Sequence, residues 1–157
     1  MNGGEPDLFF LDTNVLVYAQ ATAESRKQPI ASALLQEAIA TERGCISTQV
    51  VQEFLNVATR RAVPAFSIEE TTEYMHKVLW PLCRHFPSSA FYERALQLRN
   101  AVSLSFYDAL IVAAALELDC QWLVSEDMQH GRVIQGLRVV NPFLAEGGWP
   151  GPRGTDG

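Results

Sequence analysis

Short apolar segments alternate with longer helical patterns along most of this chain, and this alternation restricts the possible folds more than any other feature. Strands are expected at residues 8–11, 45–47, 122–125 and 137–140. Helices are expected at about 14–20, 29–42, 48–62, 68–80, 90–102 and 105–119. Alternating strands and helices favour an α/β fold with a largely parallel sheet.

A single domain accounts for most of the 157 residues, of which 48% are hydrophobic, enough to build a core. We place this domain at residues 8–143. The two ends, residues 1–7 and 144–157, are rich in Gly or Pro and are expected to be flexible.

Several features favour a soluble, cytoplasmic protein with no membrane segment. The sequence starts without a signal-peptide pattern, and its longest apolar run, 109–116, is far shorter than the ~20 residues that span a bilayer. The three cysteines are widely spaced and form no CxxC pair. Such cysteines suit a reducing compartment and argue against structural zinc.

Acidic side chains stand near the ends of the expected strands. Asp12 follows the first strand directly, and Asp127 follows the strand at 122–125, with Glu126 before it. Glu53 lies in the helix after the second strand, and Asp108 lies at the head of the helix before the third. Ligands of open α/β sheets bind beyond the carboxyl ends of the strands. These acids are therefore expected to face one cleft.

Each acid also has a purely structural explanation. Asp12 would serve as the N-cap of the helix that follows it, and the spacing of Asp108 also suits a helix start. Glu126 and Asp127 would suit the positive end of a short helix. Glu53 would be an ordinary solvated acid.

The neighbours of Asp108 and Glu53 weaken the structural explanation for these two. Asp108 precedes the run "ALIVAAAL", which is apolar on every side of a helix and so indicates burial. A carboxylate at the head of a buried helix is partly desolvated and needs a partner. Glu53 borders the apolar stripe that contains Val50, Phe54 and Val57. Both acids are better placed at a cleft than in open water.

Crowded carboxylates repel one another and raise each other's pKa, and a divalent cation keeps them ionised. An oxygen-only ligand set suggests Mg²⁺ or Mn²⁺. The histidines show no metal-ligand spacing and are interpreted as surface or packing residues: His76, His85 and His130.

Four segments together resemble the PIN-domain nucleases, and among these most closely the VapC-type toxins of bacterial toxin–antitoxin pairs. They are "FLDTNVLVYA", "ISTQVVQEFLNV", "LSFYDALIVAAAL" and "LVSEDMQHG…GLRVVNPF", in the order that the family has them. The resemblance extends from about Phe9 to Phe143, and the combination is far more specific than "LDTN" alone.

The resemblance implies a three-layer α/β/α fold and an acidic cleft that binds Mg²⁺ or Mn²⁺ and cleaves single-stranded RNA. The family's catalytic and metal-binding acids fall on Asp12, Glu53, Asp108 and Asp127. Its supporting polar residues fall on Asn14 and Ser125, and less firmly on Thr13. Glu126 is an additional carboxylate, which leaves open whether it or Asp127 binds the metal.

The same resemblance implies a small antitoxin protein as partner, and it suggests a homodimer, for which apolar residues in the helices at 30–40 and 48–62 would supply an interface. The net charge of −6 alone disfavours nucleic acid, but bound cations would reverse the local field. Basic residues that are candidates for phosphate contacts, or are ordinary surface charge, are Arg60, Arg61, Arg26 and Lys27.

Three other functions remain possible on sequence grounds. The chain could be an RNA-processing PIN nuclease rather than a toxin. It could be a non-catalytic binding module that keeps the fold, although the intact acids argue against this. A phosphatase with a nucleophilic Asp12 would want a second Asp two positions later, where this chain has Asn14.

Overall fold

The computed structural model describes residues 7–60, 66–144 and 149. Its central sheet contains β1 (Phe9–Leu11), β2 (Gly44–Ser47), β3 (Cys83–His85), β4 (Trp122–Val124), β5 (Val133–Ile134) and β6 (Leu137–Val140). The strand order is β3-β2-β1-β4-β6-β5, and every pair is parallel except β5 with β6. The expected mostly parallel sheet is confirmed.

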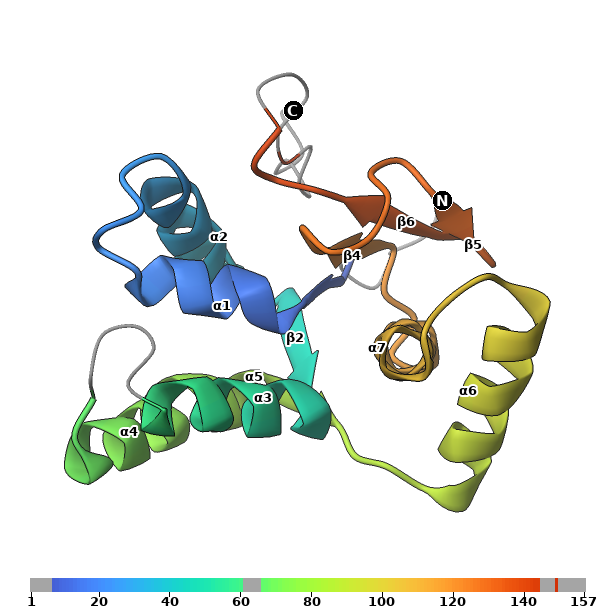
Figure 1. The fold of residues 1–157 in the computed structure, drawn as a ribbon, viewed down its shortest axis with the longest axis horizontal. Coiled ribbons are helices and arrows are strands. Elements are labelled where there is room, and N and C mark those ends of the chain that lie inside the picture. Colours follow the sequence, from blue (N-terminus) through green and yellow to red (C-terminus); the bar gives the residue numbers. More distant parts are fainter. Residues whose placement is uncertain (1–6, 61–65, 145–148, 150–157) are drawn as a thin grey trace.

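The helices are α1 (Thr13–Gln20), α2 (Lys27–Thr41), α3 (Thr48–Thr59), α4 (Ile68–Tyr74), the π-helical turn η1 (Met75–Leu79), α5 (Trp80–Leu82), α6 (Ser89–Ala101) and α7 (Phe106–Glu117). Figure 1 shows α1 and α2 on one side of the sheet and α7 on the other, with α6 packed outside α7. Helices therefore cover both faces, which confirms the three-layer α/β/α fold.

The sheet is short but deeply buried. All three residues of β1 and all four of β2 are buried, as expected for strands covered on both faces. The residues of α7 from Ala109 to Ala115 are also buried, which agrees with their apolar character on every side of the helix. The carboxyl ends of β1, β2 and β4 consequently meet at one rigid edge.

Serine side chains cap the first turns of several helices. The Ser47 side chain accepts a hydrogen bond from Val50 N–H at the start of α3, and Ser67 and Glu70 form the expected capping box of α4. The expected helix at 68–80 is continuous to Leu82 but widens at η1. The wide turn directly precedes Pro81, which lacks the N–H that an α-helix would use.

Two strands were not expected from the sequence. β3 has three residues and begins two residues after Pro81, and β5 has only two residues. Neither is long enough to show a recognisable alternation of apolar and polar residues. The helix expected at 48–62 has its last described helical residue at Thr59, and Arg61 lies outside the described residues.

Trp149, from the expected flexible tail, lies with its ring centroid 4.9 Å from that of Phe9. The remaining tail residues from 145 onward, and residues 1–6, lie outside the described ranges.

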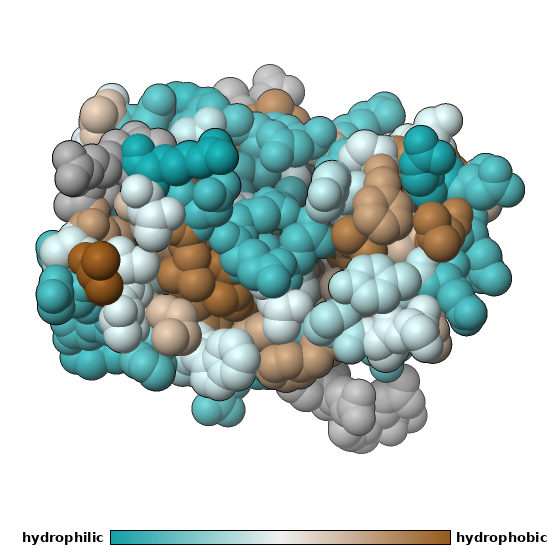
Figure 2. Space-filling model, turned by 60° about the horizontal axis from the view of Figure 1, so that its bottom comes forward, coloured by the Kyte–Doolittle hydropathy of each residue, from teal (hydrophilic) through white to brown (hydrophobic). Residues whose placement is uncertain are grey.

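The apolar residues of α2 and α3 were expected to supply a dimer interface. Most of them are instead buried in the core: Ala31, Leu34, Leu35, Ala38, Val50, Val51, Phe54 and Ala58. Exposed large apolar residues lie instead mainly on α4, α5, α6 and the segment after β3, among them Trp80, Phe86 and Leu96. Figure 2 shows the face formed by α3–α6, where apolar patches interrupt a polar surface.

None of the helices in the described ranges is both long and apolar enough to cross a membrane by itself. The pair α6 and α7, bent by 118° at the break between them, reaches the length and composition only in combination.

Candidate active site

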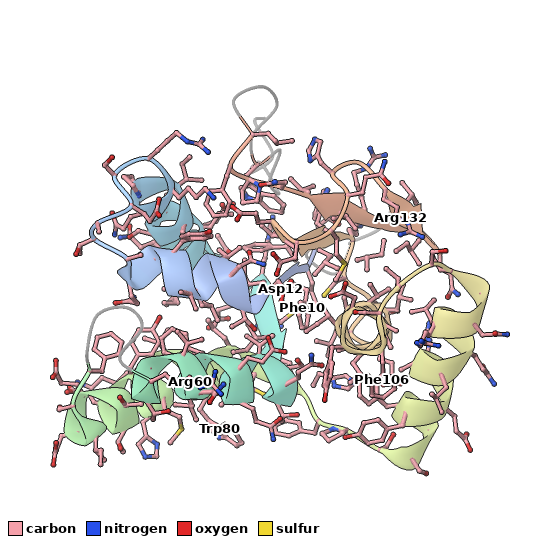
Figure 3. All side chains as sticks on the ribbon, in the orientation of Figure 1. Phe10, Asp12, Arg60, Trp80, Phe106 and Arg132 are labelled. Carbon is pink, nitrogen blue, oxygen red and sulfur yellow. The ribbon has the colours of Figure 1, made fainter. Side chains whose placement is uncertain are left out.

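Asp12 is the buried centre of the acidic edge, with only 5% of its surface exposed. It follows β1 and caps α1, because its Oδ1 accepts a hydrogen bond from Thr13 N–H at 2.8 Å. Its Oδ2 accepts a bond of 2.7 Å from the buried Ser125 hydroxyl at the end of β4. The helix-capping explanation of Asp12 is thus correct for one oxygen, while the other accepts a bond from the neighbouring strand end. Figure 3 labels Asp12 where β1 gives way to α1.

Asn14 connects Asp12 to the segment after β4. Its Nδ2 lies 3.4 Å from Asp12 Oδ2 and 3.1 Å from Asp127 Oδ2, and its Oδ1 accepts a bond from Glu126 N–H. Ser125 Oγ accepts from Asp127 N–H at 3.1 Å. The structure therefore brings Asp12, Asn14, Ser125 and Asp127 together, although 113 residues separate Asn14 from Asp127.

Glu53 reaches the same edge from the second turn of α3. Its Oε2 accepts a hydrogen bond from the Thr13 hydroxyl at 2.9 Å, and its Oε1 accepts one from Gln49 Nε2 at 2.7 Å. Glu53 is half-buried. Two hydrogen bonds and partial burial are inconsistent with a merely solvated surface acid.

Asp108 lies in the first turn of α7. Its backbone N–H donates to Ser105 Oγ at 3.1 Å. The Asp108 carboxylate, however, does not return a bond to Ser105, and no hydrogen bond joins it to any residue within the described part of the chain. Only the preceding residue is connected to Glu53: Gln49 Nε2, which bonds Glu53, also lies 3.4 Å from the carbonyl oxygen of Tyr107. The half-buried Asp108 carboxylate is consequently free to bind a ligand.

Glu126 is directed away from the other acids. Its Oε2 accepts a hydrogen bond from Lys27 Nζ at 2.6 Å, and its Oε1 accepts one from the Tyr18 hydroxyl at 2.9 Å. Lys27 Nζ also lies 4.6 Å from the Tyr18 ring centroid. The bond to Glu126 raises the pKa of Lys27. Both oxygens of Glu126 are engaged, whereas Asp127 is exposed and, among the described residues, its carboxylate accepts a hydrogen bond from Asn14 alone.

Burial dominates the ionisation of Asp12 and raises its pKa from the ordinary 3.8 to about 6. The hydrogen bonds from Ser125 and Thr13 lower the pKa, while the nearby carboxylates of Asp127 and Glu53 raise it further. The site thus concentrates negative charge around one poorly solvated carboxyl group, and a cation placed there would relieve this repulsion.

The donor chemistry of the edge suits a hard cation, since its side chains offer carboxylate, hydroxyl and amide oxygens and no sulfur or imidazole. Within residues 7–60, 66–144 and 149, no group of three or more His, Cys, Asp or Glu side chains is already arranged around a common point. Thr13 connects Asp12 with Glu53, and Asn14 connects Asp12 with Asp127, while no hydrogen bond within the described residues joins the Asp108 carboxylate to another acid.

Among the basic residues named from the sequence, Arg60, Arg26 and Lys27 form no hydrogen bond or ion pair with Asp12, Glu53, Asp108 or Asp127, and Arg61 lies outside the described residues. Arg60 is exposed at the end of α3, seven residues after Glu53 and so about 10 Å further along the helix. Arg26 donates to the carbonyl oxygen of Phe143 at 2.6 Å, and Lys27 is paired with Glu126.

Sequence reasoning missed Gln49 and Tyr18, and it named Lys27 only as a candidate phosphate contact or ordinary surface charge. Gln49 precedes Glu53 by four residues, and this spacing on one helix face was an available signal. Tyr18 and Lys27 hold Glu126, but no pattern in the sequence connects them to it, because Lys27 and Glu126 are 99 residues apart.

A family model for the PIN domain matches residues 9–134. No curated protein sequence matches the chain. Among solved structures, a toxin–antitoxin complex from Klebsiella pneumoniae is similar with a TM-score of 0.59 at 19% identity, covering 82% of this chain and 93% of that one.

Two further structures show the same fold. The VapBC2 complex of Rickettsia felis, bound to a DNA fragment from their promoter, has a TM-score of 0.56 at 17% identity, covering 84% of this chain and 96% of that one. VapC20 of Mycobacterium tuberculosis, a toxin that cleaves the sarcin-ricin loop, has a TM-score of 0.53 at 17% identity, covering 76% and 91%. At these identities the likeness is one of fold.

Proposed function

The chain belongs to the PIN domain family, and we propose that it is a metal-dependent endoribonuclease that cleaves single-stranded RNA. The observation that carries the proposal is the buried carboxyl group of Asp12, whose pKa is raised by burial and by the carboxylates of Asp127 and Glu53. Clustered acids at the carboxyl ends of parallel strands suit a cation, and a cation suits phosphate chemistry.

The residues present fit Mg²⁺ or Mn²⁺, which Asp12, Glu53, Asp108 and Asp127 would hold. When bound, such an ion supplies a water of lowered pKa and stabilises charge on the phosphate. We assign the fourth position to Asp127 rather than Glu126, because both Glu126 oxygens are already bonded to Lys27 and Tyr18.

The supporting residues hold the acids in place and keep them ionised. The Ser125 and Thr13 hydroxyls donate to Asp12 and Glu53, and Asn14 donates to both Asp12 and Asp127. These donors stabilise carboxylates rather than carboxylic acids. Among them, the bond from Ser125 most strongly opposes the effect of burial on Asp12.

We assign the chain to the toxin half of a toxin–antitoxin pair, with a small antitoxin protein as partner. Support comes from the similar folds in the complexes from Klebsiella pneumoniae and Rickettsia felis. An RNA-processing PIN nuclease is the alternative. Co-expression with the adjoining small gene separates the two, because a toxin arrests growth alone and co-purifies with its antitoxin.

A homodimer also belongs to this proposal, although its interface cannot use the buried residues of α2 and α3. The better material is the aromatic pair of Trp80 and Phe86, which are 51% and 54% exposed with ring centroids 5.7 Å apart. Light scattering on the purified chain decides the oligomeric state.

The nuclease proposal is tested with purified full-length chain and an unstructured RNA, in Mn²⁺ and in EDTA. Cleavage is expected only with metal, and Mn²⁺ is expected to raise the melting temperature because it binds the folded site alone. Asp12→Asn should remove both effects. Glu69→Gln, which changes an exposed acid on α4, is the matched control and should change neither. Undiminished cleavage in EDTA would refute the mechanism.

A further inference from the structure

A cavity of about 250 Å³ lies beside the acidic edge, and nothing in the proposed mechanism uses it. It lies between the start of α3, the end of β3 and the first turns of α6 and α7. We call it the aromatic pocket, after the two ring pairs in its wall. Phe91 and Tyr92 belong to α6, with ring centroids 5.2 Å apart, and Phe106 and Tyr107 belong to α7, 5.7 Å apart.

The aromatic pocket adjoins the proposed catalytic residues through shared elements. Ser47, in its wall, ends β2, and β2 is the direct neighbour of β1, which positions Asp12. Gln49 also lines the pocket, and its amide bonds both Glu53 and the carbonyl oxygen of Tyr107. Tyr107 directly precedes Asp108. Figure 3 shows Phe106 at the start of α7 beside α6, with Asp12 at the end of β1.

The wall of the pocket is aromatic and polar but carries almost no charge. Among the described residues that form it there is no Lys, Arg, Asp or Glu. Its polar groups are the hydroxyls of Ser47 and Thr48, the phenol hydroxyls of the two tyrosines, two glutamine amides and His85, whose Nε2 is 2.8 Å from Glu117. Such a wall does not suit a phosphate group, and it does not suit a charged side chain of a partner protein.

The same wall suits a flat, neutral, hydrogen-bonding group. Tyr92 and Tyr107 are 45% and 68% exposed, so their ring faces are accessible for stacking. Gln52 is exposed, and its amide can donate and accept hydrogen bonds. Unpaired bases of RNA are recognised in this way, by stacking on aromatic rings and by hydrogen bonds to base edges. The volume of the aromatic pocket is below the ~300 Å³ at which pockets for drug-sized ligands begin, so the pocket suits a single small group such as one base.

We propose that the aromatic pocket binds one unpaired base of the RNA, next to the phosphodiester that the acidic edge cleaves. This inference rests on the proposed function, since it assigns a base-binding subsite to the same substrate. A base held there fixes which phosphodiester reaches Asp12 and makes cleavage sensitive to the nucleotide at one position. Gln49 and Gln52 supply the polar contacts that distinguish one base from another.

The test combines substrate and protein changes in double-mutant cycles. A short single-stranded RNA that the enzyme cleaves is synthesised with one abasic ribose at each position in turn. For the full-length wild-type chain, one abasic position beside the cleavage site should weaken binding in EDTA by about tenfold, because one stacked base is lost. The same position should lower cleavage in Mn²⁺ by a similar factor.

The protein changes are Tyr107→Ala and Tyr92→Ala, with Leu96→Ala as control. Leu96 is exposed on α6 but does not line the pocket. In at least one of the tyrosine variants, an abasic ribose at the sensitive position should weaken RNA binding by less than about twofold, because the stacking partner of the base is already absent. Leu96→Ala should retain the full tenfold effect.

The outcomes separate the pocket from the nuclease proposal. If the chain cleaves RNA but no abasic position weakens binding, or if both tyrosine variants keep the wild-type sensitivity to the abasic position, the pocket proposal alone is overturned. Binding that is sensitive to one base, without any cleavage, supports the pocket and overturns the nuclease. Absence of RNA binding overturns both. If the tyrosine variants instead change the oligomeric state in light scattering and leave base sensitivity intact, the pocket is a protein contact and the inference fails.

Discussion

The two sides of the acidic edge differ in how firmly their acids are held. On the β1–β4 side, Asp12 is buried and accepts hydrogen bonds from Thr13, Ser125 and Asn14. On the α7 side, the half-buried Asp108 carboxylate has no such partner within the described part of the chain. The first side is arranged before any ligand arrives, while the second depends on a ligand to fix its geometry. The two acids also differ in their loss of solvent on folding, because Asp12 is almost fully buried and Asp108 only partly.

The largest expected effect is on catalysis, and it should be similar for both acids. Asp12→Asn and Asp108→Asn should each lower cleavage by at least about 100-fold, because each removes a carboxylate of the proposed metal site, worth several kcal/mol. Stability should then distinguish the two sides. In EDTA at pH 7, Asp12→Asn should raise the free energy of unfolding by about 1–2 kcal/mol, since it removes a carboxylate that is costly to ionise when buried.

Asp108→Asn should leave the free energy of unfolding unchanged within about 0.5 kcal/mol, as for other substitutions without specific contacts. Urea unfolding of the metal-free variants measures both values. If Asp108→Asn stabilises the protein as much as Asp12→Asn, both carboxylates are equally costly to ionise in the folded protein and the comparison fails.

The next effect is the pH dependence of stability, which should follow Asp12. Its pKa is about 6 in the folded protein and 3.8 when unfolded. Between these values the folded state binds the extra proton, so the free energy of unfolding should fall as pH rises from about 4 to about 6. Above pH 6 both states are ionised and the loss is complete, at most about 3 kcal/mol.

Urea unfolding of metal-free protein between pH 4 and 7 measures this loss directly. The matched control is Asp12→Asn, in which this component should disappear while the other acids still titrate. A wild-type profile that is no steeper than the profile of Asp12→Asn would show that Asp12 is not the group whose raised pKa causes the loss of stability. Mn²⁺ should flatten the wild-type profile, because the cation stabilises the ionised carboxyl group.

Local and long-range features of the site were not equally predictable from the sequence. The positions of Asp12, Glu53 and Asp108 follow from where strands end and helices begin, which short segments reveal. The contacts of Asn14 with Asp127 and of Lys27 with Glu126 join residues 113 and 99 positions apart. No spacing rule reaches so far, and the sequence therefore left Glu126 and Asp127 undecided.

The same limit explains the errors in the fold. β5 was missed because two residues cannot show a period, and β3 because it follows Pro81 within a few residues. The apolar residues of α2 and α3 were interpreted as interface material because a sequence shows apolar character without showing which side of a helix is covered. The structure places them in the core.

The smallest expected effect distinguishes the neighbouring carboxylates Glu126 and Asp127. Asp127→Asn should lower cleavage by about 10- to 100-fold, the range seen when a group that supports a metal site is lost. Glu126→Gln should lower it by less than about threefold, because the Glu126 oxygens face Lys27 and Tyr18 rather than the other acids.

The stability of the same two variants should show the reverse order. Glu126→Gln leaves the Lys27 ammonium, whose side chain is 24% exposed, without its charged partner, and should lower the unfolding midpoint. Asp127 is exposed, and its loss removes repulsion from Asp12, so Asp127→Asn should raise that midpoint slightly. Cleavage rates and urea midpoints of the two variants, measured side by side, complete the comparison. A large loss of cleavage in Glu126→Gln with little change in Asp127→Asn would exchange their roles and show that Lys27 releases Glu126 when metal binds.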